Sequence, residues 1–334
     1  MKKALLVGLL FVLLGSGVLL GSAWLQYQAF VQTPLAIPAG GAVFDLQPGS
    51  SGRRIISELA ERGLTRDDWR WKLLMRVEQA VYRAGEYRLE PGLTPPELLE
   101  LLASGDVIRY RFTLVEGWSF RQLAAALSAD PVLEHELPYG DGLGQAVLNR
   151  FPGMDHPEGW FLPETYQFIR GDSDVEILQR ANAAMERALM DAWESRLVGL
   201  PLQSPYELLI LASIIEKETA LESERGQIAG VFVRRLSLGM RLQTDPTVIY
   251  GLGESFDGDI RRRDLRTDTP YNTYTRHGLP PTPIDMPGRA SLLAAAHPEP
   301  GEALYFVADG KGGHTFSRTL AEHQAAVDRL IGNN

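Results

Sequence analysis

An uncharged run near the N-terminus limits the possible folds more than any other feature of the sequence. Residues 4–24 carry no charged side chain, and a helix of that length can cross the roughly 30 Å hydrocarbon core of a bilayer. Lys2 and Lys3 precede the run and favour an N-terminus that stays in the cytoplasm. We therefore predict that residues 1–25 form a cytoplasmic stub and a single transmembrane helix, with the rest of the chain exported.

A cleaved signal peptide is the alternative interpretation, because Gly21-Ser22-Ala23 offers small residues at a possible cleavage site. An apolar run of this length is unusual for a signal peptide, so an uncleaved anchor fits better. No second run of spanning length follows in the sequence. We therefore expect the folded domains to lie just outside one membrane.

Composition narrows the classes of function. A chain of 334 residues is long enough for two globular parts with appendages. The formal net charge of −9 leaves no cationic excess to meet phosphates, so we expect no nucleic-acid partner. The absence of cysteine excludes disulfides and thiolate catalysis. The six histidines are scattered without HExxH spacing, so we expect no metal site.

A short plan recurs three times after a predicted linker at 26–41. Each copy has a short strand at 44–46, 87–89 or 112–114, a glycine turn, a Ser or Thr, and an amphipathic helix at 55–62, 96–103 or 120–127. The Ser or Thr is a suitable N-cap. The repeat predicts a small α+β module at 42–128, which acts either as a spacer or as a ligand-binding module.

Residues 129–334 are predicted to form a second, mixed α+β domain. Apolar periodicity predicts helices at 174–198, 224–238 and 319–331, and the last follows a strand at 303–308 with a glycine-rich turn. Trp160, Phe161 and Tyr166 form an aromatic cluster that is either core or a platform for sugar rings, with core favoured.

Two glutamates end the apolar helix predicted at 208–219. At about 100° per residue, Glu218 continues the apolar line of Ile214 and Ile215, whereas Glu216 points roughly the other way. A carboxyl group on that line is poorly solvated, which raises its pKa and prepares it to act as a general acid. The alternative is a helix end that frays into solvent, with both glutamates serving solubility.

A long stretch from 241 to 283 is rich in polar residues, proline and glycine. Long loops inside a domain commonly line a cleft. Amides, hydroxyls and aromatic rings are the side chains that a carbohydrate groove requires.

Several motifs in this order resemble one family. They are ASIIEKET at 212–219, RLQTDPTVIYG at 241–251, YNTY at 271–274, GLPP at 278–281, AAAHP at 294–298 and FVADGKGGHTF at 306–316. They are similar to the YceG-like (MltG) family of endolytic murein transglycosylases. The resemblance implies a LysM-like N-terminal module, a catalytic domain at 129–334, and a single-pass protein of the inner membrane with a periplasmic catalytic domain. It also places the catalytic glutamate at the second Glu of the EKE run, Glu218.

The implied reaction cleaves the MurNAc–GlcNAc β-1,4 bond of nascent peptidoglycan and leaves 1,6-anhydro-MurNAc ends, which would limit strand elongation. One carboxylate suffices, whereas an ordinary glycosidase needs two, and no cofactor is expected. Cell-wall synthases are further candidate partners. The candidates for holding substrate are Gln243, Thr244, Asp245, Tyr271, Asn272, Tyr274 and His314.

Two alternatives to the transglycosylase stay open. One is a membrane-anchored hydrolase that uses Glu218 with Asp245, and the other is a non-catalytic wall-binding scaffold. Asp245 has a structural alternative as well, because an aspartate before Pro246 commonly caps a turn.

Overall fold

The computed structural model describes residues 2–332 and has a mixed α+β fold. The chain divides into two compact units. The N-terminal unit holds the chain up to Tyr110 together with Ile169–Gly171, and the C-terminal unit holds Arg111–Phe168 and the chain from Asp172 onward. The predicted boundary at 128/129 therefore lies later in the chain than the point at which the contacts divide it.

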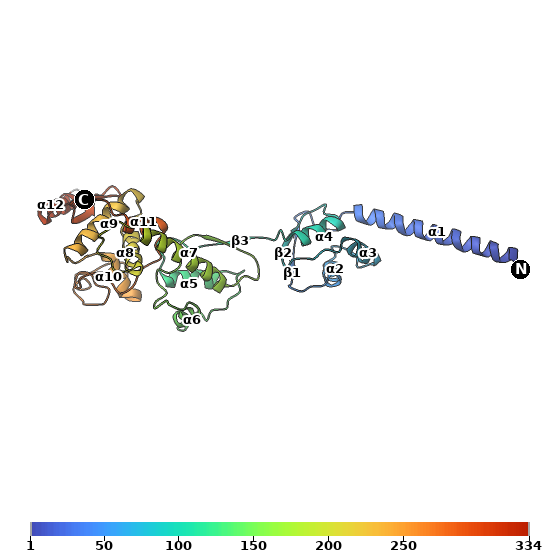
Figure 1. Cartoon of the computed structure of the whole chain (residues 1–334), viewed down its shortest axis with the longest axis horizontal. Coiled ribbons are helices and arrows are strands. Elements are labelled where there is room, and N and C mark those ends of the chain that lie inside the picture. The colour runs from blue at the N-terminus through green and yellow to red at the C-terminus, as the bar shows by residue number, and fades with distance from the viewer. Residues whose placement is uncertain (1, 333–334) are drawn as a thin grey trace. The chain divides into compact units, whose positions relative to one another are not determined.

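Helix α1 (Lys2–Gln32) is the long helix at the N-terminal end in Figure 1. Its segment Gly8–Gln32 has a mean hydropathy of 2.0, which is long and apolar enough for a membrane span. This helix is consistent with a membrane anchor. It extends into the predicted linker, because Phe30 and, after the helix, Leu35 are buried in the core of the N-terminal unit.

The N-terminal unit is built around one antiparallel strand pair. Strand β1 (Ala42–Leu46) pairs with β2 (Gly85–Leu89), and Phe44 lies opposite Tyr87. Burial of the strands' inner face requires a cover on one side. Three helices supply it, and Trp71 is fully buried among them: α2 (Gly52–Glu61), α3 (Trp69–Glu78) and α4 (Pro95–Ser104).

The threefold repeat of strand, glycine turn and capped helix is confirmed. Ser51 and Ser119 accept hydrogen bonds from backbone N–H groups in the first turns of α2 and α5 (Phe120–Ala129), and Thr94 caps α4. The turn glycines Gly49, Gly92 and Gly117 all have positive φ, which residues with a side chain rarely adopt. The third copy, with β3 (Tyr110–Thr113), packs within the C-terminal unit apart from the first residue of β3.

The C-terminal unit surrounds helix α8 (Pro205–Glu218), whose residues 208–215 are buried on every side. Ser204 caps this helix and Pro205 occupies its first turn. The remaining elements are α6 (Leu143–Arg150), β4 (Thr165–Phe168), α7 (Asp174–Ser195), α9 (Glu222–Ser237), α10 (Asp245–Leu252), the 3₁₀ turn η1 (Gly253–Ser255), α11 (Arg289–Ala296), β5 (Tyr305–Ala308), β6 (His314–Ser317) and α12 (Leu320–Gly332).

Two sequence interpretations are settled by packing in this unit. Phe161 and Tyr166 are buried, so the aromatic cluster at 158–166 is core. Trp160 stacks on Tyr206 with ring centroids 5.8 Å apart. The polar stretch at 241–283 is not all loop, because α10 and η1 interrupt it.

Candidate active site

Glu218 is the last residue of α8 and keeps only partial exposure. Burial raises the pKa of its carboxyl group to about 7, because the charged form is poorly solvated there. A hydrogen bond from the Thr244 hydroxyl to Oε1 lowers the pKa, and the negative charge of Asp245 raises it. His314 and Arg235 add smaller lowering effects. A carboxyl group with this pKa holds a proton near neutral pH and can also release it.

Glu216 lies two residues earlier and has a different environment. Arg225 Nη2 of α9 donates to its Oε1 at 3.1 Å, and the Gly288 N–H donates to its Oε2 at 2.9 Å. Within residues 2–332, no Lys, Arg or His lies within ion-pair distance of Glu218. Glu216 therefore joins α8 to α9 and to the N-terminus of α11, whereas Glu218 is left without a paired cation.

Two buried threonines, Thr247 and Thr273, hold Thr244, which contacts Glu218. The Thr244 N–H donates to Thr273 Oγ1 at 3.1 Å, Thr247 Oγ1 donates to the Thr244 carbonyl at 2.8 Å, and the Thr247 and Thr273 hydroxyls lie 2.9 Å apart. Gln243, the residue before, is exposed and has a φ of +52°. A left-handed conformation costs a residue with a side chain about 1 kcal/mol or more. The surrounding hydrogen bonds hold this strained turn beside the carboxyl group.

Asp245 and Tyr274 form a second polar pair at this end of α8. Asp245 is the first residue of α10, and Thr244 takes the N-cap position. The Tyr274 hydroxyl donates to Asp245 Oδ1 at 2.6 Å. Burial and this hydrogen bond raise the pKa of Tyr274 well above its usual range, so the hydroxyl keeps its proton. The negative charge of Asp245 acts on Glu218 without contact between the two carboxyl groups.

His314 is fixed by Glu224, a residue that the sequence reasoning missed. Glu224 Oε2 lies 2.7 Å from His314 Nδ1, and Glu224 Oε1 accepts the His314 backbone N–H at 2.9 Å. Arg235, also missed, donates to the carbonyl groups of Leu242 (2.7 Å) and Leu304 (2.6 Å). No sequence spacing links these residues to Glu218, because each pairing joins segments far apart in the chain.

Tyr271 and Asn272 are placed differently from the other candidates. The Tyr271 hydroxyl lies 2.8 Å from Thr282 Oγ1. Asn272 is buried, donates to the carbonyl groups of Asp264 and Thr267 at 3.0 and 2.7 Å, and accepts the Tyr274 N–H at 2.9 Å. The amide of Asn272 therefore shapes the loop that carries Tyr274.

A large cavity opens beside this end of α8. It has a volume of about 1450 Å³ and is lined by Glu158, Lys217, Tyr250 and Tyr271, among others, but not by Glu218. Glu158 is buried and accepts hydrogen bonds from the Phe120 N–H (2.7 Å) and the Tyr250 hydroxyl (3.0 Å). Burial raises the pKa of Glu158 to about 7. The sequence analysis missed this second carboxyl group with a raised pKa, since only its aromatic neighbours stood out.

A third carboxyl group, that of Asp285, is enclosed completely. Burial raises its pKa well above the usual range, and the Lys217 charge opposes this. Neither of its oxygens has a hydrogen-bond partner among the described residues. With no exposed surface, Asp285 cannot reach a polymer substrate.

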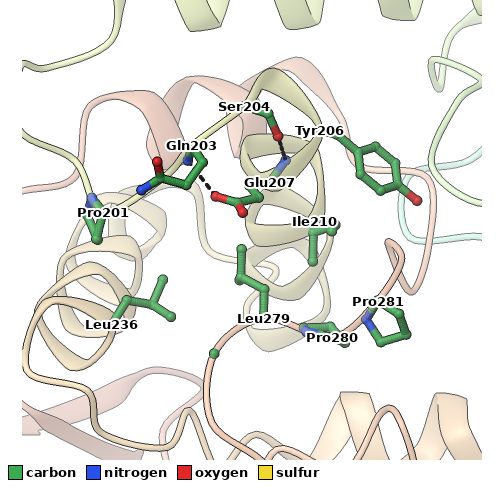
Figure 2. Close-up of a pocket in the computed structure, with 11 residues that line it drawn as sticks. Pro201, Gln203, Ser204, Tyr206, Glu207, Ile210, Leu236, Leu279, Pro280 and Pro281 are labelled. Carbon is green, nitrogen blue, oxygen red and sulfur yellow. Dashed lines mark hydrogen bonds between the residues drawn. The ribbon is translucent and has the colours of Figure 1, made fainter.

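A smaller pocket of about 420 Å³ lies at the opposite end of α8 (Figure 2). Tyr206, Leu279, Pro280 and Pro281 line it, and Glu207 accepts the Gln203 N–H at 2.5 Å. Because α8 has 14 residues, its two ends lie ~20 Å apart. This pocket is therefore separate from Glu218.

Comparison with known proteins identifies the family. The YceG-like family model matches residues 44–329. An endolytic murein transglycosylase of Bacillus subtilis is 31% identical over 86% of this chain and 84% of its own length. One from Streptococcus pneumoniae is 26% identical over 99% of this chain and 65% of its own length. The crystal structure of a YceG-like protein from Listeria monocytogenes matches with a TM-score of 0.54 and 29% identity, covering 85% of this chain and 98% of that one. The chain belongs to the YceG-like family.

Proposed function

We propose that the protein is an endolytic murein transglycosylase in which Glu218 is first the general acid and then the general base. The relatives named as endolytic murein transglycosylases, similar over most of the chain, support the activity. The observation that carries the role of Glu218 is its carboxyl group, which has a pKa of about 7 and lies within hydrogen-bond reach of Thr244 in the RLQTDPTVIYG motif.

The reaction needs two proton transfers through one carboxyl group. Protonated Glu218 gives its proton to the bridging oxygen of the MurNAc–GlcNAc β-1,4 bond, and the bond from that oxygen to MurNAc C1 breaks. The Glu218 carboxylate then takes the proton of the C6 hydroxyl of the same MurNAc while O6 bonds to C1. The products are a free GlcNAc hydroxyl and a 1,6-anhydro-MurNAc end, and Glu218 regains its proton.

Thr244 suits both states of the acid. Its hydroxyl donates to Oε1 when Glu218 is a carboxylate, and Oε1 still accepts when the proton is on Oε2. The carboxyl group therefore keeps one orientation while Oε2 exchanges the proton with substrate. The buried threonines around Thr244 make that orientation rigid.

We assign the other candidates to substrate binding in three ways. Gln243 and Asp245 have exposed side chains beside Glu218 and are suited to sugar hydroxyls. Tyr274 and His314, each held by a carboxylate, are suited to directional hydrogen bonds. Tyr271 offers a ring to sugar in the cavity, and Asn272 acts indirectly through its loop.

A hydrolase that uses Glu218 with Asp245 is the second candidate. Asp245 is close enough to raise the pKa of Glu218, and a carboxylate at that range could orient a water molecule. Mass spectrometry of the products separates the two reactions, because hydrolysis leaves reducing MurNAc ends that are heavier by one water than anhydro ends.

The decisive experiment digests uncrosslinked glycan with the full-length protein and two variants. Glu218→Gln is expected to release no anhydro ends, whereas Glu158→Gln, which alters the other carboxyl group with a pKa of about 7, keeps the product and most of the rate. Wild-type rates from Glu218→Gln would refute the assignment. Binding without cleavage by the wild-type protein would favour a wall-binding scaffold.

The finer organisation of the protein is part of the proposal. We assign α1 to the inner membrane with a cytoplasmic N-terminus, the catalytic domain to the periplasm, and the N-terminal module to a LysM-like glycan-binding role. An enzyme so tethered acts on strands as they leave the membrane and can limit their length next to the synthases. Glycan pull-down with the catalytic Glu218→Gln variant, with and without charge changes in the module, tests the binding role.

A further inference from the structure

Helix α3 of the N-terminal unit has an apolar outer face. Trp69, Leu73 and Val77 are 44%, 38% and 65% exposed, and Val81 just beyond the helix is 84% exposed. Residues four apart lie on one side of a helix, so Trp69, Leu73 and Val77 form a stripe. Together with Val81 in the loop after the helix, they make up what we call the α3 face. The opposite side of α3 buries Trp71 and Leu74 in the core. The helix is therefore apolar on both sides, and only one side is covered within the described chain.

Helix α3 lies next to the end of the anchor helix (Figure 1) and meets it through Trp71, on the side opposite the α3 face. The Phe30 ring of α1 meets the Trp71 ring edge-on at 5.1 Å, and the Arg70 guanidinium lies 4.9 Å from the centre of the Phe30 ring. Tyr27 packs against the same core. The last turns of α1 and helix α3 are thus one packed body.

The depth of α3 relative to a bilayer follows from helix geometry. Trp24, at the end of the uncharged run, is exposed and is the residue type that settles at membrane–water interfaces. Phe30 lies six residues further along the same helix, a rise of ~9 Å. Helix α3 packs on Phe30, so α3 lies at the level of lipid headgroups when α1 spans the membrane.

The charges around the α3 face fit the same surface. Arg66, Lys72 and Arg76 are exposed on or just before α3, and so are Asp67 and Glu78, so the exposed cations outnumber the exposed anions there although the whole chain has a net charge of −9. Apolar and aromatic side chains flanked by cations are typical of helices that lie in the membrane interface. Anionic lipids attract such cations at short range.

We propose that the α3 face docks on the surface of the bilayer that α1 crosses, with Trp69, Leu73, Val77 and Val81 in the headgroup region and Lys72 and Arg76 facing anionic headgroups. This inference rests on the proposed anchoring of α1 and is independent of the catalytic assignment. Docking fixes the tilt of the N-terminal unit, since the anchor and the α3 face then give two attachments to one surface.

The test uses the full-length protein in vesicles that contain anionic phospholipid. Because the chain has no cysteine, a single cysteine can carry a fluorescent dye, and lipids with a quencher near the headgroup report contact. Val77→Cys is compared with Val43→Cys, which is an exposed valine on β1 of the same unit. We expect quenching at position 77 to exceed that at position 43 by about twofold or more. Equal quenching at the two positions would overturn the proposal.

Two further measurements separate the possible causes. The charge reversals Lys72→Glu and Arg76→Glu, placed in the Val77→Cys protein, are expected to weaken docking by roughly fivefold per cation, and unchanged quenching would count against the charge complementarity. A dye at Val12→Cys, within α1, reports insertion of the anchor against deep quenchers. Quenching at position 12 without quenching at position 77 would refute the docking of the α3 face and leave the anchoring of α1 intact. Absence of quenching at position 12 would refute the anchoring of α1, and with it the docking that rests on it.

Discussion

The two glutamates at the C-terminal end of α8, Glu216 and Glu218, have opposite environments. On one side, Arg225 and the Gly288 N–H satisfy Glu216. On the other side, Glu218 receives one hydroxyl from Thr244 and no paired cation within residues 2–332. The groups are two residues apart on one helix. The comparison shows that tertiary partners, and not helix position alone, decide which carboxyl group can hold a proton near pH 7.

The largest expected effect comes from Glu218→Gln, which removes the proton donor and keeps the shape. General acid–base catalysis contributes about 10²- to 10⁴-fold to a rate, so kcat should fall by that factor while KM changes little. The measurement is release of anhydro ends from uncrosslinked glycan. A circular dichroism spectrum like that of the wild type would show that the loss is chemical. Retained activity would contradict the assignment of different roles to Glu216 and Glu218.

Glu216→Gln should instead affect stability. The substitution leaves the buried Arg225 with the more distant Glu116 carboxylate, at 3.8 Å, as its remaining anionic partner. Breaking a buried ion pair by changing one member costs about 3 kcal/mol, so we expect a loss of up to that size. Denaturant titration measures the free energy of unfolding. The activity per folded molecule should stay close to that of the wild type. A stable Glu216→Gln protein without activity would reverse the roles assigned to the two glutamates.

The stability of Glu218→Gln relative to the wild type should depend on pH. The pKa of Glu218 is raised from 4.5 in the reference state to about 7 in the folded protein, so the folded state binds the proton more tightly than the unfolded chain. The resulting contribution to folding stability is fully present below pH 4.5 and is lost as the pH rises from there through 7. The variant should therefore gain about 3 kcal/mol on the wild type between pH 4 and pH 8. Urea titrations at the two pH values check this, and a parallel response of both proteins would contradict the assigned pKa.

The smallest expected effect comes from Thr244→Val. The Thr244 hydroxyl stabilises the carboxylate of Glu218 and lowers its pKa, so its removal should raise that pKa by about half a unit to one unit. The basic limb of the kcat/KM profile, where Glu218 loses its proton, should move to higher pH. Thr247→Val is the matched control, because it removes a hydroxyl from the same buried cluster without contact to Glu218. A shift of the limb in Thr247→Val alone would oppose the role of Thr244.

Local chemistry made much of the fold predictable from the sequence. The capped helices α2, α4 and α5, the β5–β6 hairpin and α8 all follow from residues that are neighbours in the chain. Glu218 was selected as the candidate acid in the same way, because the apolar residues on its side of the helix are close to it in the sequence. Helix α3 was missed because Trp69, Leu73 and Val77 are apolar on the exposed side, which hides the periodicity that marks one buried face.

The parts that could not be predicted depend on distant partners. His314 and Glu224 are 90 residues apart in the chain, and Thr244 and Thr273 are 29 apart. Burial raises the pKa of Glu158 to about 7, although the hydrogen bonds from the Phe120 N–H and the Tyr250 hydroxyl lower it. The sequence around Glu158 does not indicate this pKa shift, because the water around its carboxyl group is displaced by parts of the chain that are distant in sequence.

The position of Glu218 as the final residue of α8 has one more consequence. Aligned peptide dipoles leave about half a negative charge at a helix C-terminus, which disfavours an anion there. In the proposed reaction, the Glu218 carboxylate that forms when the glycosidic oxygen takes the proton is therefore opposed by the field of its own helix. That field favours uptake of a proton from the sugar hydroxyl, so the helix backbone helps to return Glu218 to the protonated form that the next cleavage needs.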